Sequence, residues 1–149
     1  MTVGVINFVE QLANKGLLNR VDIVGLFEGG ADGSGLGEIV GTYKDQFGPI
    51  SNVAAQLNGQ ERIMNITKGH PLRNIELAFL RAYSLYYGIE KLLIKHGVVA
   101  GLQQGIFVAN EYSEIGRERR YGRVLLSIST TVGGNSNKVA SIKTSGGNG

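Results

Sequence analysis

The 149-residue sequence contains no cysteine. This absence excludes disulfide bonds, thiol nucleophiles and thiolate metal ligands together, and it suits synthesis in a reducing cytoplasm. The first residues lack the basic start and the apolar run of a secretory signal. No window approaches the roughly 18 consecutive apolar residues that a membrane helix needs. We therefore expect neither a signal of that kind nor a membrane span.

Glycine is abundant, with 23 residues, against an average usage of roughly 7%. The glycines gather at residues 29–37 and 133–149, which is typical of loops and tails. The hydrophobic content of 42% and the charged content of 18% are ordinary for a globular protein. We expect one α+β domain over residues 1–132, followed by a flexible tail rich in Gly, Ser and Asn over residues 133–149.

The first half of the chain alternates strand patterns with turn signals. Residues 3–15 have helical spacing and predict a short N-terminal helix. We expect a mobile glycine-rich loop at 29–37 and a turn at Asn58-Gly59. The pattern of residues 50–57 leaves a short helix and irregular structure open. Strands are predicted at residues 21–27, 38–43 and 62–67.

Residues 72–95 predict the longest element, a helix of about 24 residues or ~36 Å. Pro71 lies where helices often begin, and Lys95 and His96 suit a helix end. Among the tyrosines, Tyr86 falls on the apolar stripe. Tyr83 and Tyr87 share one face of the helix, and this face either packs in the core or forms a binding surface. The stripe consists of Leu72, Ile75, Phe79, Tyr83, Tyr86, Ile89 and Leu93.

Two further strands, at residues 103–112 and 121–132, are predicted to form a closing hairpin with a polar tip at 113–120. Groups of strands on either side of one long helix favour an antiparallel or mixed sheet with the helices on one face. The predicted fold is therefore an antiparallel or mixed β-sheet packed against one long helix and a short N-terminal helix.

A search for catalytic chemistry finds no complete set of residues. The segment Asp32 to Gly37 is followed by Glu38 and a strand pattern, instead of the Lys-Ser/Thr pair and the helix of a phosphate loop. His70 and His96 lie a helix length apart, which disfavours a shared metal ion. Glu111 and Glu114 are read as solvated acids. We expect no enzyme activity, no cofactor and no metal, although an unrecognised enzyme site remains a third hypothesis.

The tip of the predicted hairpin carries Tyr and Arg, the residue types enriched in interface hot spots, together with charges of both signs. Alternating signs suit contacts between neighbouring copies in a ring, and a plain solvated hairpin is the competing interpretation. A second function, a small nucleic-acid-binding module, would use Arg117, Arg119, Arg120 and Arg123. The candidate interface residues are Glu111, Tyr112, Glu114, Arg117, Glu118, Arg119, Arg120, Tyr121 and Arg123.

The order of these elements over residues 5–132 resembles one family, the tail terminator and neck proteins, or minor capsid proteins, of long-tailed bacteriophages. The resemblance is one of layout and carries no diagnostic motif. The glycine-rich insert at 29–37 and the 17-residue tail depart from the family's pattern. The matching segments are residues 8–12, 21–27, the turn at 58–59 with the strand at 62–67, the long helix, and residues 111–117 and 121–129.

The resemblance implies a structural virion protein of the phage neck. It implies a ring, usually hexameric, that terminates the tail tube and joins the tail to the head connector. The partners would be other copies of the chain, the tail tube protein and the head–tail connector, while DNA would pass through the channel without specific binding. Such a protein would be made in the host cytoplasm and located in the neck of the virion. The loop at 29–37 and the tail would then become ordered on docking.

Overall fold

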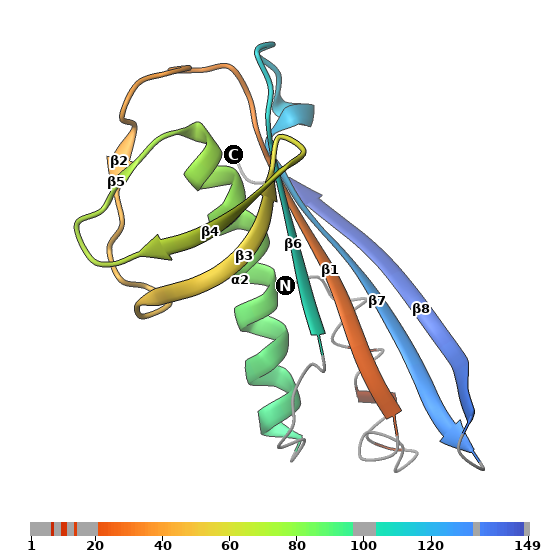
Figure 1. The fold of residues 1–149 in the computed structure, drawn as a ribbon. Helices are drawn as coiled ribbons and strands as arrows, with labels where there is room; N and C mark the ends of the chain where they lie inside the picture. Colours follow the sequence, from red (N-terminus) through yellow and green to blue (C-terminus); the bar gives the residue numbers. More distant parts are fainter. Residues whose placement is uncertain are drawn as a thin grey trace.

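The computed structural model describes residues 21–96, 104–132 and 135–147, together with four single positions between residues 7 and 14. A mixed sheet lies against one long helix (Figure 1). The predicted helix at residues 3–15 lies outside the described residues except for those four positions, which do not show it. The elements in chain order are β1 (Val21–Ala31), β2 (Gly41–Thr42), β3 (Ile50–Leu57), β4 (Gln60–Ile66), β5 (Pro71–Leu72), α2 (Asn74–Lys95), β6 (Gln104–Glu111), the 3₁₀ turn η2 (Arg117–Arg119), β7 (Tyr121–Val132) and β8 (Asn135–Gly147).

The six-stranded sheet has the order β4-β3-β6-β1-β7-β8. Strand β1 is parallel to β6, with pairs from Val24↔Gln104 to Ala31↔Glu111, and antiparallel to β7. The sheet is therefore mixed, as predicted. The expected hairpin between residues 103–112 and 121–132 is wrong, because β1 lies between β6 and β7. An alternating pattern shows that a segment is a strand, but it does not show which strand is its neighbour.

Helix α2 confirms the predicted long helix, but it begins at Asn74. Pro71 does not start the helix, since Pro71 and Leu72 pair with Thr42 and Gly41 in a separate two-stranded ladder. This ladder also corrects the prediction of a strand over residues 38–43, of which only Gly41–Thr42 forms one. A proline cannot donate a ladder hydrogen bond, so it is tolerated in a short edge strand of this kind.

An aromatic cluster fills the space between α2 and the sheet. Phe27 of β1 and Phe107 of β6 stack with their ring centroids 5.6 Å apart. Tyr83 and Tyr86 of α2 approach Phe107 to 5.7 Å and 5.3 Å, which places both tyrosines against the core. The third tyrosine, Tyr87, contacts Phe47 at 5.2 Å. The core-packing interpretation therefore agrees with the structure for Tyr83 and Tyr86.

Close contact between β1 and α2 requires small residues on both elements. A Cβ atom added to Gly29 would lie 1.8 Å from the carbonyl oxygen of Ala78. Ala78 and Ala82, on the facing side of α2, are completely buried. Gly29 and Gly30 were expected to open a mobile loop, but they are buried residues of β1. The missing side chain of Gly29 serves this approach, while that of Gly30 makes room for Tyr121 and the carbonyl of Arg119.

Three predictions in the segment before α2 have different outcomes. Residues 50–57 form strand β3, so neither a helix nor irregular structure is correct there. The Asn58-Gly59 turn is confirmed, because it joins β3 to β4 with φ angles of 51° and 82°. Positive φ at both central residues is the geometry of a type I′ hairpin turn. The predicted strand at 62–67 corresponds to β4.

Strand β8 occupies the segment that was expected to be a flexible tail. It pairs antiparallel with β7 from Tyr121↔Gly147 to Val132↔Asn135, with one irregularity after Ile128. Pairing along the edge of β7 satisfies the backbone of β8 through ladder hydrogen bonds. Such pairing does not depend on a high content of apolar side chains, which is why composition alone suggested a tail. No helix in the described part of the chain is long and apolar enough to cross a membrane.

The contact between β1 and α2 gives a stability prediction. We expect Gly29→Ala to lower the free energy of unfolding by at least about 2 kcal/mol, because the new methyl group meets rigid backbone. Gly41→Ala is the matched control, since nothing lies within 4 Å of its Cβ position, and it should change stability by less than about 0.5 kcal/mol. Urea unfolding measures both. Equal effects of the two substitutions would contradict this packing.

Candidate functional site

The candidate site lies where β1 and β6 end side by side. Ala31 and Glu111 are the last paired residues of these parallel strands, so the segments that follow them leave from the same edge of the sheet (Figure 1). We call residues 112–120 the crossover loop, because they pass from the end of β6 across β1 to the start of β7. Eight of the nine predicted interface residues lie in this loop or in β7.

The carboxylate of Asp32 joins the two segments. Its side chain is only 4% exposed. It accepts hydrogen bonds from the backbone N–H of Ser34, at 3.1 Å, and of Gly116, at 3.2 Å. The guanidinium of Arg120 lies 3.4 Å away and forms an ion pair with it. Asp32 therefore connects the end of β1 to both the middle and the end of the crossover loop.

The pKa of Asp32 reflects this environment. Burial alone would raise the pKa of the carboxyl group. The hydrogen bonds from Ser34 and Gly116 and the charge of Arg120 outweigh burial, so the pKa lies below its ordinary value of 3.8. The carboxylate is thus charged throughout the physiological pH range, and its contacts persist there.

Backbone contacts tie the crossover loop to the end of β1 at two more points. The N–H of Tyr112 donates to the carbonyl of Ala31 at 2.9 Å, and the N–H of Gly33 donates to the carbonyl of Glu114 at 2.8 Å. A Cβ atom on Gly33 would lie 2.1 Å from the carbonyl oxygen of Ser113. Glycine is therefore needed at residue 33 for the two segments to approach each other.

Helix α2 holds the same region from the other side. The amide of Asn74, at the start of the helix, donates to the carbonyl oxygens of Asp32 and Ser34 at 3.0 and 2.8 Å. The guanidinium of Arg81 donates to the carbonyl of Gly30. The segment at 29–37 was predicted to be mobile, but its first half is fixed by these contacts. Its second half, residues 34–37, is exposed.

Tyr121 is the centre of a second set of contacts on the strands. Its hydroxyl donates to the carboxylate of Glu28, accepts from the amide of Asn110 at 3.2 Å, and lies 2.9 Å from the hydroxyl of Tyr112. Burial, followed by the hydrogen bond to Glu28, raises the pKa of Tyr121 far above its ordinary value. The phenol therefore remains protonated and keeps its donor role.

Two arginines cover the tyrosine rings of this set. Arg119 lies over Tyr112, 4.8 Å from the ring centroid, and Arg123 lies over Tyr121 at 4.6 Å. Arg123 also pairs with Glu28 at 3.5 Å. The Arg119–Tyr112 contact brings the two ends of the crossover loop together. The Arg123–Glu28 ion pair joins the start of β7 to β1.

The nine predicted interface residues therefore separate into two groups. Glu114, Arg117 and Glu118 are exposed at the tip of the crossover loop. The others are wholly or partly buried, and most of them contact their own chain: Glu111, Tyr112, Arg119, Arg120, Tyr121 and Arg123. For the nucleic-acid hypothesis this means that Arg120 and Arg123 already face carboxylates and that Arg119 lies on a tyrosine. The four arginines do not form one free cationic surface.

Three important residues were not identified from the sequence. Asp32 lay in a segment interpreted as a mobile loop, and Glu28 lay at the end of a predicted strand. Ile115 is 75% exposed at the tip of the crossover loop, more than any other large apolar side chain among the described residues. Its position between Glu114 and Arg117 was the one available signal in the sequence.

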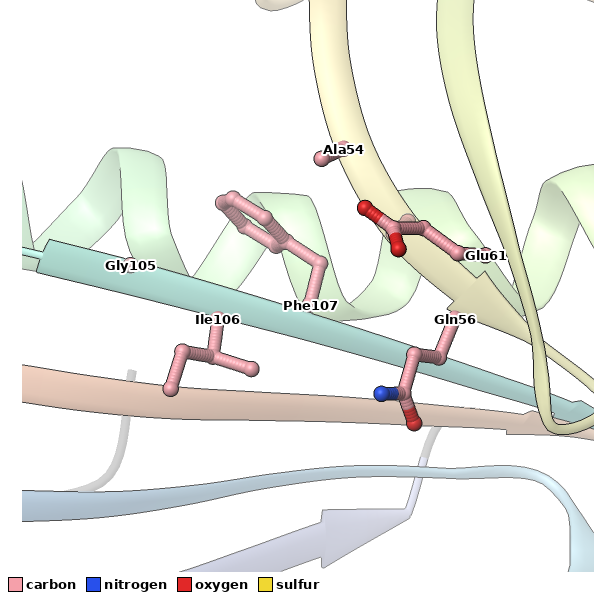
Figure 2. Close-up of a pocket in the computed structure, with 7 residues that line it drawn as sticks. Ala54, Gln56, Glu61, Gly105, Ile106 and Phe107 are labelled. Atoms are coloured by element: carbon pink, nitrogen blue, oxygen red, sulfur yellow. The ribbon is translucent and has the colours of Figure 1, made fainter.

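A pocket of about 230 Å³ lies elsewhere, between β3 and β6. In Figure 2, Gln56 and Ile106 project to one side of the strands and Phe107 projects to the other; Glu61 of β4 also lines the pocket. Glu61 is the one titratable side chain among its lining residues. Among the residues that the structure describes, no three His, Asp or Glu side chains group together as metal ligands. His96 caps the end of α2, and His70 lies before β5.

Comparisons with known protein families, with curated proteins and with solved structures gave no match.

The Asp32 contacts give a pH-dependent prediction. Because its pKa is lowered in the folded state, Asp32 contributes stability above pH 3.8, and this contribution is lost as the pH falls through the lower, folded-state pKa. We expect Asp32→Asn to be less stable than the wild type at pH 6, with a difference that shrinks toward pH 2.5. Urea midpoints across this range measure it, and Glu114→Gln, at an exposed carboxylate of the same loop, is the control. A constant difference between Asp32→Asn and the wild type would contradict the charge-based role.

Proposed function

We propose that this chain is a structural subunit of a homo-oligomeric ring, and specifically a tail terminator or neck protein of a long-tailed bacteriophage. In this role it would close the end of the tail tube and join the tail to the head connector. Its partners would be neighbouring copies of the chain, the tail tube protein and the connector, and DNA would pass through the channel. The protein would be made in the host cytoplasm and reside in the virion.

The observation that carries the proposal is the exposure of Ile115 on a firmly held loop. The loop is bound to its own chain before and after its tip, by the carbonyl of Ala31 and by Asp32. A loop that is already ordered loses little further entropy on binding, whereas fixing a free residue costs roughly 1–2 kcal/mol. Covering one isoleucine contributes about 1.5–3 kcal/mol. A preformed apolar contact point of this kind supports a role in assembly.

The charges beside Ile115 support contacts between identical copies. Glu114 and Glu118 flank Arg117 at the exposed tip, so the surface presents both signs to a neighbour. When one surface patch meets a different patch on the next copy, the contact is heterologous and can close into a ring. Rim charges of this type set orientation and partner choice more than affinity. The phage assignment itself rests on the resemblance in layout, and the loop supports the assembly role.

The proposal predicts that Ile115→Ser weakens self-association. If Ile115 is an interface hot spot, which contributes about 2 kcal/mol or more, its loss should weaken association by roughly 30-fold. Sedimentation velocity over a range of protein concentrations measures this effect. Ile94→Ser is the control, because Ile94 is also exposed, at 61%, but lies near the far end of α2.

Because ring formation can require a partner, the same measurement is repeated with a tail tube protein encoded near this chain, and complexes are viewed by negative-stain electron microscopy. Rings on tube ends, lost in Ile115→Ser and kept in Ile94→Ser, are expected. A chain that stays monomeric alone and also ignores the tube protein would contradict the proposed function.

A further inference from the structure

Beside the Asp32 contacts lies a cavity of about 170 Å³ between the end of β1, the segment after it, the start of α2 and the end of the crossover loop. Its polar lining residues are Asp32, Ser34, Asn74, Arg81 and Arg120. A cavity needs only roughly 10–15 Å³ of such volume to hold one water molecule. This one therefore has room for a molecule several times the size of water.

The charges around the cavity do not balance. Two guanidinium groups, of Arg81 and Arg120, face a single carboxylate, that of Asp32. Asp32 already accepts hydrogen bonds from Ser34 and Gly116 and pairs with Arg120. The guanidinium of Arg81 donates a hydrogen bond to the neutral carbonyl of Gly30. The cavity thus carries an excess of one positive charge.

The environment of Arg81 is consistent with this excess. Burial, followed by the charge of Arg120, lowers the pKa of Arg81, and Asp32 opposes these effects only in part. An arginine cannot relieve such a strain by losing its proton, since it stays charged at all physiological pH values. A bound anion would relieve it, because oxyanions match the fork of donors that guanidinium groups present.

We propose that this cavity binds one small oxyanion, with Arg81 and Arg120 as its two cationic contacts. The ligand class is a phosphate or carboxylate group, and the site is separate from Ile115 and from ring assembly. The anion would complete the charge balance at the junction of β1, α2 and the crossover loop. Binding would stabilise the folded chain. At anion concentrations above the dissociation constant, the gain in the free energy of unfolding would grow with the logarithm of the anion concentration.

The test is a titration of the wild-type chain with inorganic phosphate and, separately, with acetate, at constant ionic strength set by sodium chloride. Two-dimensional ¹H–¹⁵N NMR follows the Nε–Hε signals of the arginines. We expect saturable shifts of the Arg81 and Arg120 signals and of the Gly116 amide. The anion that saturates the signals at the lower concentration identifies whether the site prefers a phosphate or a carboxylate group.

Variants locate the site independently. Arg81→Gln should weaken binding of the preferred anion by about tenfold or more, which is the usual effect of losing one charge-assisted hydrogen bond. Arg81→Lys keeps the charge and should retain most of the affinity, and Arg117→Gln, at an exposed arginine outside the cavity, should bind like the wild type. The wild-type titration stands even if a variant fails to fold. Shifts that do not saturate, shifts that chloride produces equally, or unchanged affinity in a folded Arg81→Gln chain would overturn the proposal.

Discussion

The buried carboxylate of Asp32 is the contact on which the organisation of this end of the molecule depends. A charged group out of contact with water must be fully paired, because leaving it unpaired is strongly unfavourable. Asp32 meets this requirement by taking donors from Ser34, from Gly116 and from Arg120. Since these donors belong to two segments far apart in the sequence, satisfying one carboxylate positions the crossover loop on the end of β1.

The packing of β1 against α2 places Asp32 where this can happen. Gly29, Ala78 and Ala82 let the helix lie close to the central strand, and Asn74 and Arg81 then reach the backbone of residues 30–34. The helix, the central strand and the crossover loop meet at one point as a result. Arg81 of the helix and Arg120 of the loop come together at this point, and they give the cavity beside Asp32 its excess of positive charge. The Asp32 contacts and the proposed anion site therefore arise from the same packing.

Elements with strong local signals were predictable from the sequence. Helix α2 follows from its apolar stripe, and the Asn58-Gly59 turn follows from residues that tolerate positive φ. The order of strands was not predictable, because β6 and β7 flank β1 through contacts between distant residues. Strand β8 was not predicted either. Its pairing with β7 is made by backbone N–H and C=O groups, which are the same in every sequence and leave no pattern of side chains.

The candidate site was predicted in part. The Tyr and Arg content of the crossover loop drew attention to it in the sequence, but composition could not tell which of its side chains face the chain's own core. Tyr121 was expected at an interface and is buried, whereas Ile115 was overlooked and is exposed. The glycines at 29, 30 and 33 looked like signs of mobility, and they are places where backbone approaches backbone. Distinguishing these roles requires the neighbouring segment, which a local pattern does not contain.

We infer that the crossover loop is held in one conformation before any partner binds. Amide hydrogen exchange of the isolated, monomeric chain tests it most directly, because the N–H groups of Gly33 and Gly116 bond to Glu114 and Asp32 across the junction. We expect slow exchange at these two glycines relative to the exposed Gly37. Exchange at the rate of an unprotected amide at both positions would contradict it.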